Sequence, residues 1–227
     1  MRNRGRRRTA AQIVAEWEAD PKWRAEQAEF DREVEERARR MEAEERPLVA
    51  DLRKAGFNVS SLEDVINTYG AGLPWEHIAP TRPYSELLPI LFKHLQRPYS
   101  ADVRGTIAQA INGVREAEPY WAAIKEMVYK EKDDFARQML INVLCEIALR
   151  NKAFLPEILT MIRDRRLKTN RVLLVRVLTR HAPRSSAAER SLQELKNDPD
   201  LRVEIGRRLH EREVRQRRKA RRSKANR

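Results

Sequence analysis

The sequence predicts an all-α fold built from paired helices. Apolar residues recur at three- and four-residue steps through most of the body, which is the spacing that buries one side of a helix. No alternating β-branched run competes with this pattern. Similar segments also return about every 33 residues, a period typical of helical-repeat proteins. The chain is therefore expected to stack several helix pairs.

Composition separates a neutral body from two basic ends. The chain has 227 residues, of which 41% are hydrophobic and 36% are charged, so it can bury one moderate core. Residues 1–8 and 202–227 hold 17 Lys/Arg and three Glu, which gives 17 − 3 = +14, while the rest of the +13 chain carries −1. Such one-signed ends repel themselves. We expect a disordered basic arm over 1–8 and a mobile basic tail over 210–227, which can continue the last helix before it frays.

The segment 9–56 is expected to be helical and highly charged. Thr9 and Gln12 have capping-box spacing, Asp20-Pro21 restarts a helix, and Gly56 can end it after Lys54. Acid-first pairs four residues apart support a solvent-exposed helix: Glu33/Arg37, Glu35/Arg39, Glu36/Arg40 and Glu42/Arg46. Its apolar stripe comprises Trp23, Phe30, Val34, Met41, Leu48 and Leu52. This helix can dock on the body, pair with another helix, or stand free.

The segment 57–83 is predicted to hold a short helix and a loop. Ser60 or Ser61 can cap a helix that ends near Tyr69. The following Gly70 to Pro83 is rich in glycine and proline. Trp75 and His77 within it can form an aromatic binding loop, or Trp75 can plug the core and leave His77 solvated.

Four arginines mark a repeat in the remaining body. Each opens a helix after a polar turn, at separations of 33, 34 and 31 residues: Arg104, Arg137, Arg171 and Arg202. The expected first helices of the pairs are about 85–96, 119–130, 153–163 and 186–197. In the last pair, the predicted buried residues of the second helix are Val203, Ile205 and Leu209.

The repeat resembles short bacterial HEAT-like (armadillo-type) repeats over residues 84–209. The resemblance is carried by LLPILFKHLQRPYSADVR, which spans Leu87 to Arg104, and by LQELKNDPDLR, which spans Leu192 to Arg202. It implies a right-handed α-solenoid of about four helix pairs after the long charged helix, and no particular chemistry. It also implies that the four arginines reach acids of the same or the next repeat and tie the repeats together. The alternative is that they line a binding groove.

The second helices of a solenoid usually form its binding wall. Polar residues that form a stripe on two of these helices are candidates for the partner-binding face: Gln138, Asn142, Glu146, Arg176 and Arg180. The leading functional hypothesis is therefore a HEAT-repeat scaffold that binds a protein partner, while the basic ends contact nucleic acid nonspecifically.

The alternative hypothesis is a nucleic-acid-binding protein that uses its arginine-rich ends and a solenoid face. Arg suits phosphate because its planar group donates two hydrogen bonds at once. The candidate contacts are Arg4, Arg6, Arg7, Arg8, Arg212, Arg215, Arg217, Arg218, Lys219, Arg221, Arg222 and Lys224. About eight phosphate contacts predict a salt slope near −7. DNA or RNA would be held without base readout.

Catalysis has little support in the sequence. The four histidines are scattered, the glycines form no phosphate loop, and no cofactor or metal is expected. Cys145 lies among apolar residues of a predicted helix, which favours a buried inert thiol. Some DNA glycosylases are built from HEAT-like repeats, but Trp121 falls on a core stripe here and leaves Asp133 or Asp134 without an aromatic neighbour. We expect no enzyme activity.

The sequence also predicts a soluble, cytoplasmic protein. The acids Glu16, Glu18 and Asp20 interrupt any signal peptide, and no stretch of 18 apolar residues occurs, so no membrane insertion is expected. A single cysteine excludes an internal disulfide and fits a reducing compartment.

Overall fold

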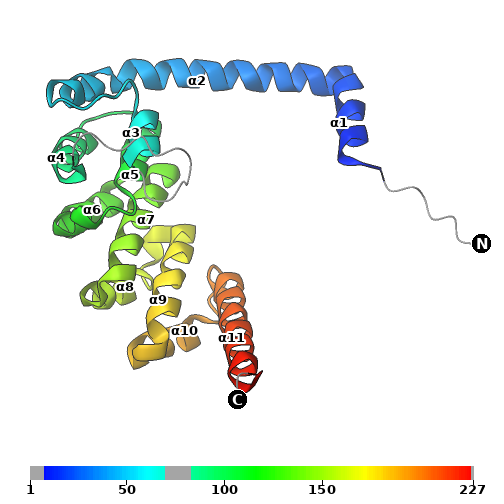
Figure 1. Cartoon of the computed structure of the whole chain (residues 1–227), viewed down its shortest axis with the longest axis vertical. Helices are drawn as coiled ribbons and strands as arrows, with labels where there is room; N and C mark the ends of the chain where they lie inside the picture. Colours follow the sequence, from blue (N-terminus) through cyan, green and yellow to red (C-terminus); the bar gives the residue numbers. More distant parts are fainter. Residues whose placement is uncertain (1–7, 70–82, 226–227) are drawn as a thin grey trace, which may run out of the picture. The chain divides into compact units, whose positions relative to one another are not determined.

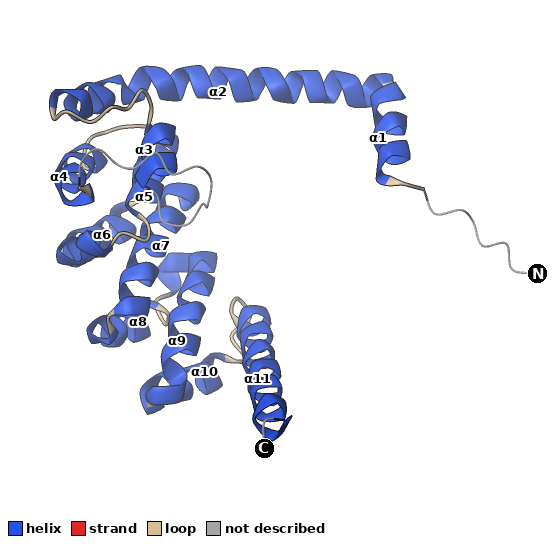
Figure 2. Ribbon diagram, viewed as in Figure 1, coloured by secondary structure: helices blue, strands red, loops and turns tan. Residues whose placement is uncertain are grey.

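The structure is a computed structural model that describes residues 8–69 and 83–225. These residues form α-helices and short 3-10 helices joined by turns, with no strand among them (Figure 2). The predicted all-α class is confirmed. Trp75 and His77 lie outside the described residues, as do Arg4, Arg6 and Arg7.

The chain divides into two units, Met1–Glu44 and Glu45–Arg227. The first contains α1 (Ala10–Ala19) and most of α2 (Pro21–Lys54). The predicted capping box is confirmed, because Thr9 accepts from the Gln12 amide and the Gln12 side chain accepts from the Thr9 amide. The predicted restart is confirmed too, since Asp20 accepts from the Lys22 amide. Gly56, with φ 88°, follows the end of α2 as expected.

The first unit exposes its apolar side chains. Trp17 and Trp23 stack with ring centroids 6.5 Å apart, and Phe30 and Val34 are 58% and 48% exposed. The predicted pair of Arg39 with Glu35 is present at 3.1 Å. In this unit the helices have ion pairs along their surface but no buried apolar core among the described residues.

The compact unit begins at Glu45, ahead of the repeat region that was predicted to start at residue 84. Leu48 and Leu52 at the end of α2 are completely buried, and the Glu45 carboxylate accepts from the Leu62 amide, 3.3 Å away, at the start of α3 (Leu62–Tyr69). Because α3 in turn packs against α5 of the next helix pair, the end of α2 belongs to the same core. The 33-residue period identified residues 84–209, and the non-repeating residues 45–83 were not recognised by it.

The rest of the compact unit consists of successive helix pairs. The first helices of the pairs are α4 (Tyr84–Leu95), α6 (Trp121–Lys130), α8 (Leu155–Met161) and α10 (Ser186–Leu195). The second helices are α5 (Ala101–Ile111), α7 (Asp134–Arg150), α9 (Val175–His181) and α11 (Arg202–Ala225). Each second helix packs against the next, in the order α5, α7, α9 and α11 (Figure 1).

The second helices α5 and α7 approach each other closely at Gly105 of α5. A Cβ atom there would come within 2.4 Å of the Phe135 ring on α7. Leu140, Leu144 and Ile147 of α7 are buried nearby in the chain. The α5–α7 contact therefore depends on a residue without a side chain.

The third pair departs from the prediction. Residues Arg165–Leu174 are a 3-10 segment broken at Lys168 (φ 49°), and α9 begins only at Val175. Arg171 therefore precedes its α-helix instead of opening it. Its guanidinium turns back to the carbonyls of Lys168 and Ile162, which orders this segment in the 3-10 form.

The last pair corrects one further expectation, and its second helix continues into the predicted tail, as the sequence allowed. Val203 was predicted to be buried but is 77% exposed, because Leu201 and Ile205 fill the core positions on either side of it. The predicted tail from residue 210 is part of α11 up to Ala225. Pairs four residues apart, Glu211/Arg215 and Glu213/Arg217, continue the helix beyond the core.

Two of the four turn arginines bind acids of the following turn. Arg104 donates from Nε and Nη2 to the Glu131 carboxylate at 2.8 and 2.9 Å. Arg171, only 1% exposed, donates to Asp198 at 3.0 and 3.1 Å and also binds Asp200. Both links span 27 residues and join successive pairs.

The other two arginines differ. Arg137 binds the Glu131 carbonyl and Asp134 within its own pair, while Asp164, 27 residues ahead, is held by Arg166. Arg202 is exposed on the last helix pair. Carboxylates of the same or the next pair therefore bind three of the four arginines, as the resemblance implies for all four.

Among the described residues, no helix combines the length and the apolar character needed to cross a membrane.

Candidate functional site

A groove of about 700 Å³ lies between α9 and α11. Five of its lining residues are arginines, and none is acidic. The lining residues are Leu149, Arg176, Thr179, Arg180, Pro183, Arg208, Arg212, Arg215 and Gln216. We call it the arginine groove.

The α9 wall is set by contacts with α7. Arg176 forms an ion pair with Glu146 at 3.0 Å and donates to the Asn142 carbonyl at 3.3 Å. Its Nε is buried and has no hydrogen-bond partner among the described residues. Arg180 follows one turn later and is exposed. These two arginines share a face because they lie four residues apart.

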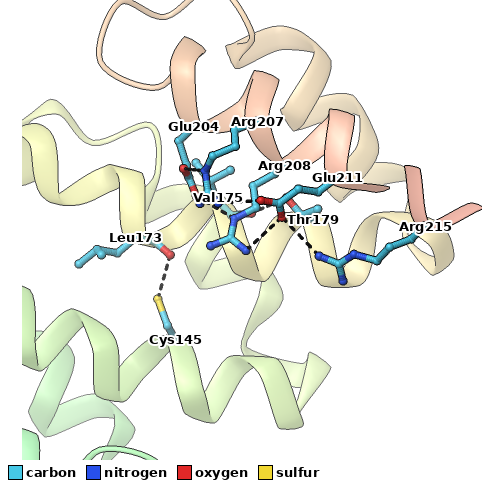
Figure 3. A network of polar contacts seen from close by, with 9 residues as sticks. All are labelled: Cys145, Leu173, Val175, Thr179, Glu204, Arg207, Arg208, Glu211 and Arg215. Carbon is cyan, nitrogen blue, oxygen red and sulfur yellow. Dashed lines mark hydrogen bonds and ion pairs between the residues drawn. The ribbon is translucent and has the colours of Figure 1, made fainter. Parts of the chain in front are cut away.

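The α11 wall is set by carboxylates behind the groove. Arg208 donates to Glu204 at 2.7 Å and lies 3.9 Å from Glu211, which also accepts from Arg215 at 3.3 Å (Figure 3). Arg212 binds Glu189 of α10 through two bonds of 2.7 and 3.0 Å. Carboxylates therefore fix these three guanidinium groups.

The supporting pairs stay charged near neutral pH. The hydrogen bonds between Arg212 and Glu189 raise the pKa of the arginine and lower the pKa of the carboxyl. Burial opposes ionisation of Glu204, but hydrogen bonds from Arg207 and Arg208 lower its pKa on balance. Arg176, Arg208 and Arg212, whose side chains are mostly enclosed and paired, therefore have less freedom to lose on binding than the exposed Arg180 and Arg215.

The charge of the groove favours an anionic ligand. Four carboxylates support the five lining arginines, which leaves 5 − 4 = +1, and a guanidinium keeps donors free when an acid occupies one edge. Beyond the groove, residues 217–225 of α11 hold six Lys/Arg and no acid, which gives +6. The sequence therefore remains rich in positive charge along α11 past the groove.

The groove brings together two sets of residues that the sequence kept apart. Arg176 and Arg180 were predicted on a partner-binding face, and Arg212 and Arg215 were predicted on a free tail. Asn142 and Glu146 contact Arg176 from α7, so they support the groove wall. Gln138 is exposed nearer the start of α7 and is not part of the lining.

Of the other predicted nucleic-acid contacts, Arg8, Arg217 and Arg218 are not among the lining residues of the groove. Arg8 is exposed and binds Glu16 of α1 at 2.6 Å, so it is not a free arm residue. Arg217 lies 3.8 Å from Glu213, and Arg218 is exposed. Lys219, Arg221, Arg222 and Lys224 belong to α11 by backbone, while their side chains lie outside the description.

Sequence reasoning missed Arg208 and the apolar part of the lining. Arg212 lies four residues after Arg208, and Arg215 and Gln216 lie three and four residues after Arg212, so the helical stripe was readable from the sequence. The apposition of this stripe to α9 was not readable, because it depends on how α10 turns the chain.

The residues considered for catalysis have structural contacts. Burial raises the pKa of the Cys145 thiol to about 11, and its sulfur lies 3.4 Å from the Leu173 carbonyl (Figure 3). Trp121 is buried and stacks on Phe154, with ring centroids 4.2 Å apart. Asp133 caps α7 by accepting from the Ala136 amide, and Asp134 pairs with Arg137.

No family model, curated protein or solved structure matches this chain.

Proposed function

We propose that this protein is a non-enzymatic binding module that holds the phosphate backbone of a nucleic acid in the arginine groove. The observation that carries the proposal is the convergence of five arginines from α9 and α11 on one groove. Fixed guanidinium groups fit phosphate oxygens because each can donate two parallel hydrogen bonds. The compact unit then acts as a right-handed α-solenoid of HEAT-like pairs that sets the two walls.

The groove thus contains residues from both hypotheses: Arg176 and Arg180 from the predicted partner-binding face, and Arg212 and Arg215 from the predicted nucleic-acid contacts. Residues 217–225 of α11, with a charge of +6, give long-range attraction, and the groove gives a place where the backbone is held. Binding of this kind does not read base sequence, because its contacts are to phosphates.

The test measures the affinity of the full chain for a DNA duplex of arbitrary sequence and for an RNA duplex, each across a range of salt concentrations. The probe variant is Arg180→Gln with Arg215→Gln, which changes two lining residues with exposed side chains. The matched control is Arg115→Gln with Arg190→Gln, which removes the same charge at exposed positions outside the groove.

The groove variant should lower the salt slope by about 2 units, since each duplex phosphate contact adds about 0.9. The control should change the slope by much less. Equal loss in both variants, or no salt-dependent binding by the wild type, contradicts the proposal. Binding to a polyglutamate peptide in place of either duplex supports an acidic protein partner, as the scaffold hypothesis expects.

A further inference from the structure

The first unit exposes an apolar stripe on α2. Phe30 and Val34 are exposed to 58% and 48%, and Trp23 and Met41 are half-buried on the same side of the helix. Such a stripe on a charged helix is a surface that another helix can cover.

The stripe has the spacing of a two-stranded coiled coil. Its positions alternate in steps of four and three residues, which keeps a seam along one side of a helix. In order, the seam residues are Gln27, Phe30, Val34, Arg37, Met41 and Glu44.

We propose that α2 pairs with α2 of a second copy of this chain, in antiparallel orientation. The register sets Phe30 opposite the partner's Met41, so apolar side chains meet in the seam. The same register sets Gln27 opposite the partner's Glu44, where an amide can donate to a carboxylate. Val34 then covers the methylene groups of the partner's Arg37.

The charges beside the seam select this orientation. Glu33 lies next to the seam and comes opposite the partner's Arg40, and the two-fold symmetry repeats that pair. A parallel pair in register would instead place Arg37 on the partner's Arg37 and Glu44 on the partner's Glu44. Like charges in a seam disfavour pairing, so the second copy is expected to run the other way.

The test uses sedimentation equilibrium of the full chain across the micromolar range. The wild type should show a monomer–dimer equilibrium. Glu33→Arg and Arg40→Glu should each weaken the dimer roughly tenfold or more, because each puts like charges at both symmetric contacts. Glu29→Arg is the matched control, since residue 29 lies away from the seam and is exposed.

The decisive sample is an equimolar mixture of the Glu33→Arg and Arg40→Glu chains. In the mixed dimer, each reversed charge faces an opposite charge, so dimerisation should return to near the wild-type level. A loss of fold in one variant cannot imitate this recovery. A wild type that stays monomeric throughout, a Glu33→Arg chain that dimerises like the control, or a mixture that stays monomeric overturns the proposal.

Discussion

The N-terminal unit and the compact unit are both helical and highly charged. Surface ion pairs are found along the helices of the first, whereas apolar packing and enclosed ion pairs hold the helices of the second. Over residues 8–44 no side chain is fully buried, and pairs such as Glu35 with Arg39 lie on the surface. From Glu45 onward, apolar side chains of successive helices are buried together, and charged groups such as Arg171 are enclosed and paired. The same residue types therefore have small energetic effects in one unit and large effects in the other.

The largest expected effect is the removal of a core side chain from α7. Leu144 is completely buried, so Leu144→Ala should lower the free energy of unfolding by about 2–5 kcal/mol. Val34→Ala in the N-terminal unit should change it by less than about 0.5 kcal/mol, because Val34 is exposed. Urea unfolding followed by circular dichroism checks both values, and equal effects would break the contrast.

The next effect concerns a buried ion pair. Arg171→Leu leaves Asp198 and Asp200 without their cation and should cost roughly 3 kcal/mol. Arg166→Leu removes a pair with Asp164 whose arginine is mostly exposed, and should cost about 1 kcal/mol or less. Thermal unfolding of the two variants gives the difference, and a cost for Arg166→Leu as large as that for Arg171→Leu would contradict it.

A smaller effect depends on pH. The ring of His94 is fully buried, with Nε2 3.0 Å from Asp51 and Nδ1 2.7 Å from the Tyr99 hydroxyl. Burial lowers the pKa of His94, although the hydrogen bond to Asp51 opposes the shift and the neighbouring Lys93 and Arg97 assist it.

As the pH falls, the unfolded chain therefore protonates His94 at a higher pH than the folded chain does. Stability should be complete above about pH 6.5 and should fall as the pH drops below that value. Urea unfolding between about pH 7.5 and about pH 5.5 should show a steeper loss for the wild type than for His94→Gln. A parallel loss in both would contradict the assignment. Asp51 does not confuse this window, because its hydrogen bonds with His94 and Lys93 lower its pKa to about 2.

The smallest effect concerns a surface pair of the N-terminal unit. Glu35→Gln removes the ion pair with Arg39 and should cost about 0.2–0.5 kcal/mol of local helix stability. Amide hydrogen exchange over residues 30–44 should speed up about twofold, with exchange in α7 unchanged. A change that spread into α7 would show that the two units share their stability.

The sequence was most informative where one residue pattern determines one local structure. The all-α class, the capping box at Thr9 and the restart at Asp20 follow from side chains that satisfy neighbouring backbone groups. Leu48 and Leu52 were placed on the apolar stripe of α2, but docking of that helix on the body was left open, because the end of α2 joins the core only through α3 and the next pair.

The candidate site was predicted only in fragments. The stripes on α9 and α11 are local properties, so Arg180 and Arg215 could be singled out as cations from spacing and composition. Their meeting in one groove is set by the turn before α11, where Arg171 holds Asp198 and Asp200. Such long-range pairing has no local signal in a single sequence.

The most direct test of the proposed groove is amide hydrogen exchange of the full chain with and without a DNA duplex. Because α9 and α11 form its two walls, the duplex should slow exchange in both helices and leave exchange in α4 and α6 unchanged. Slowed exchange in α11 alone, or no slowing in either wall, would contradict binding of the phosphate backbone in the arginine groove.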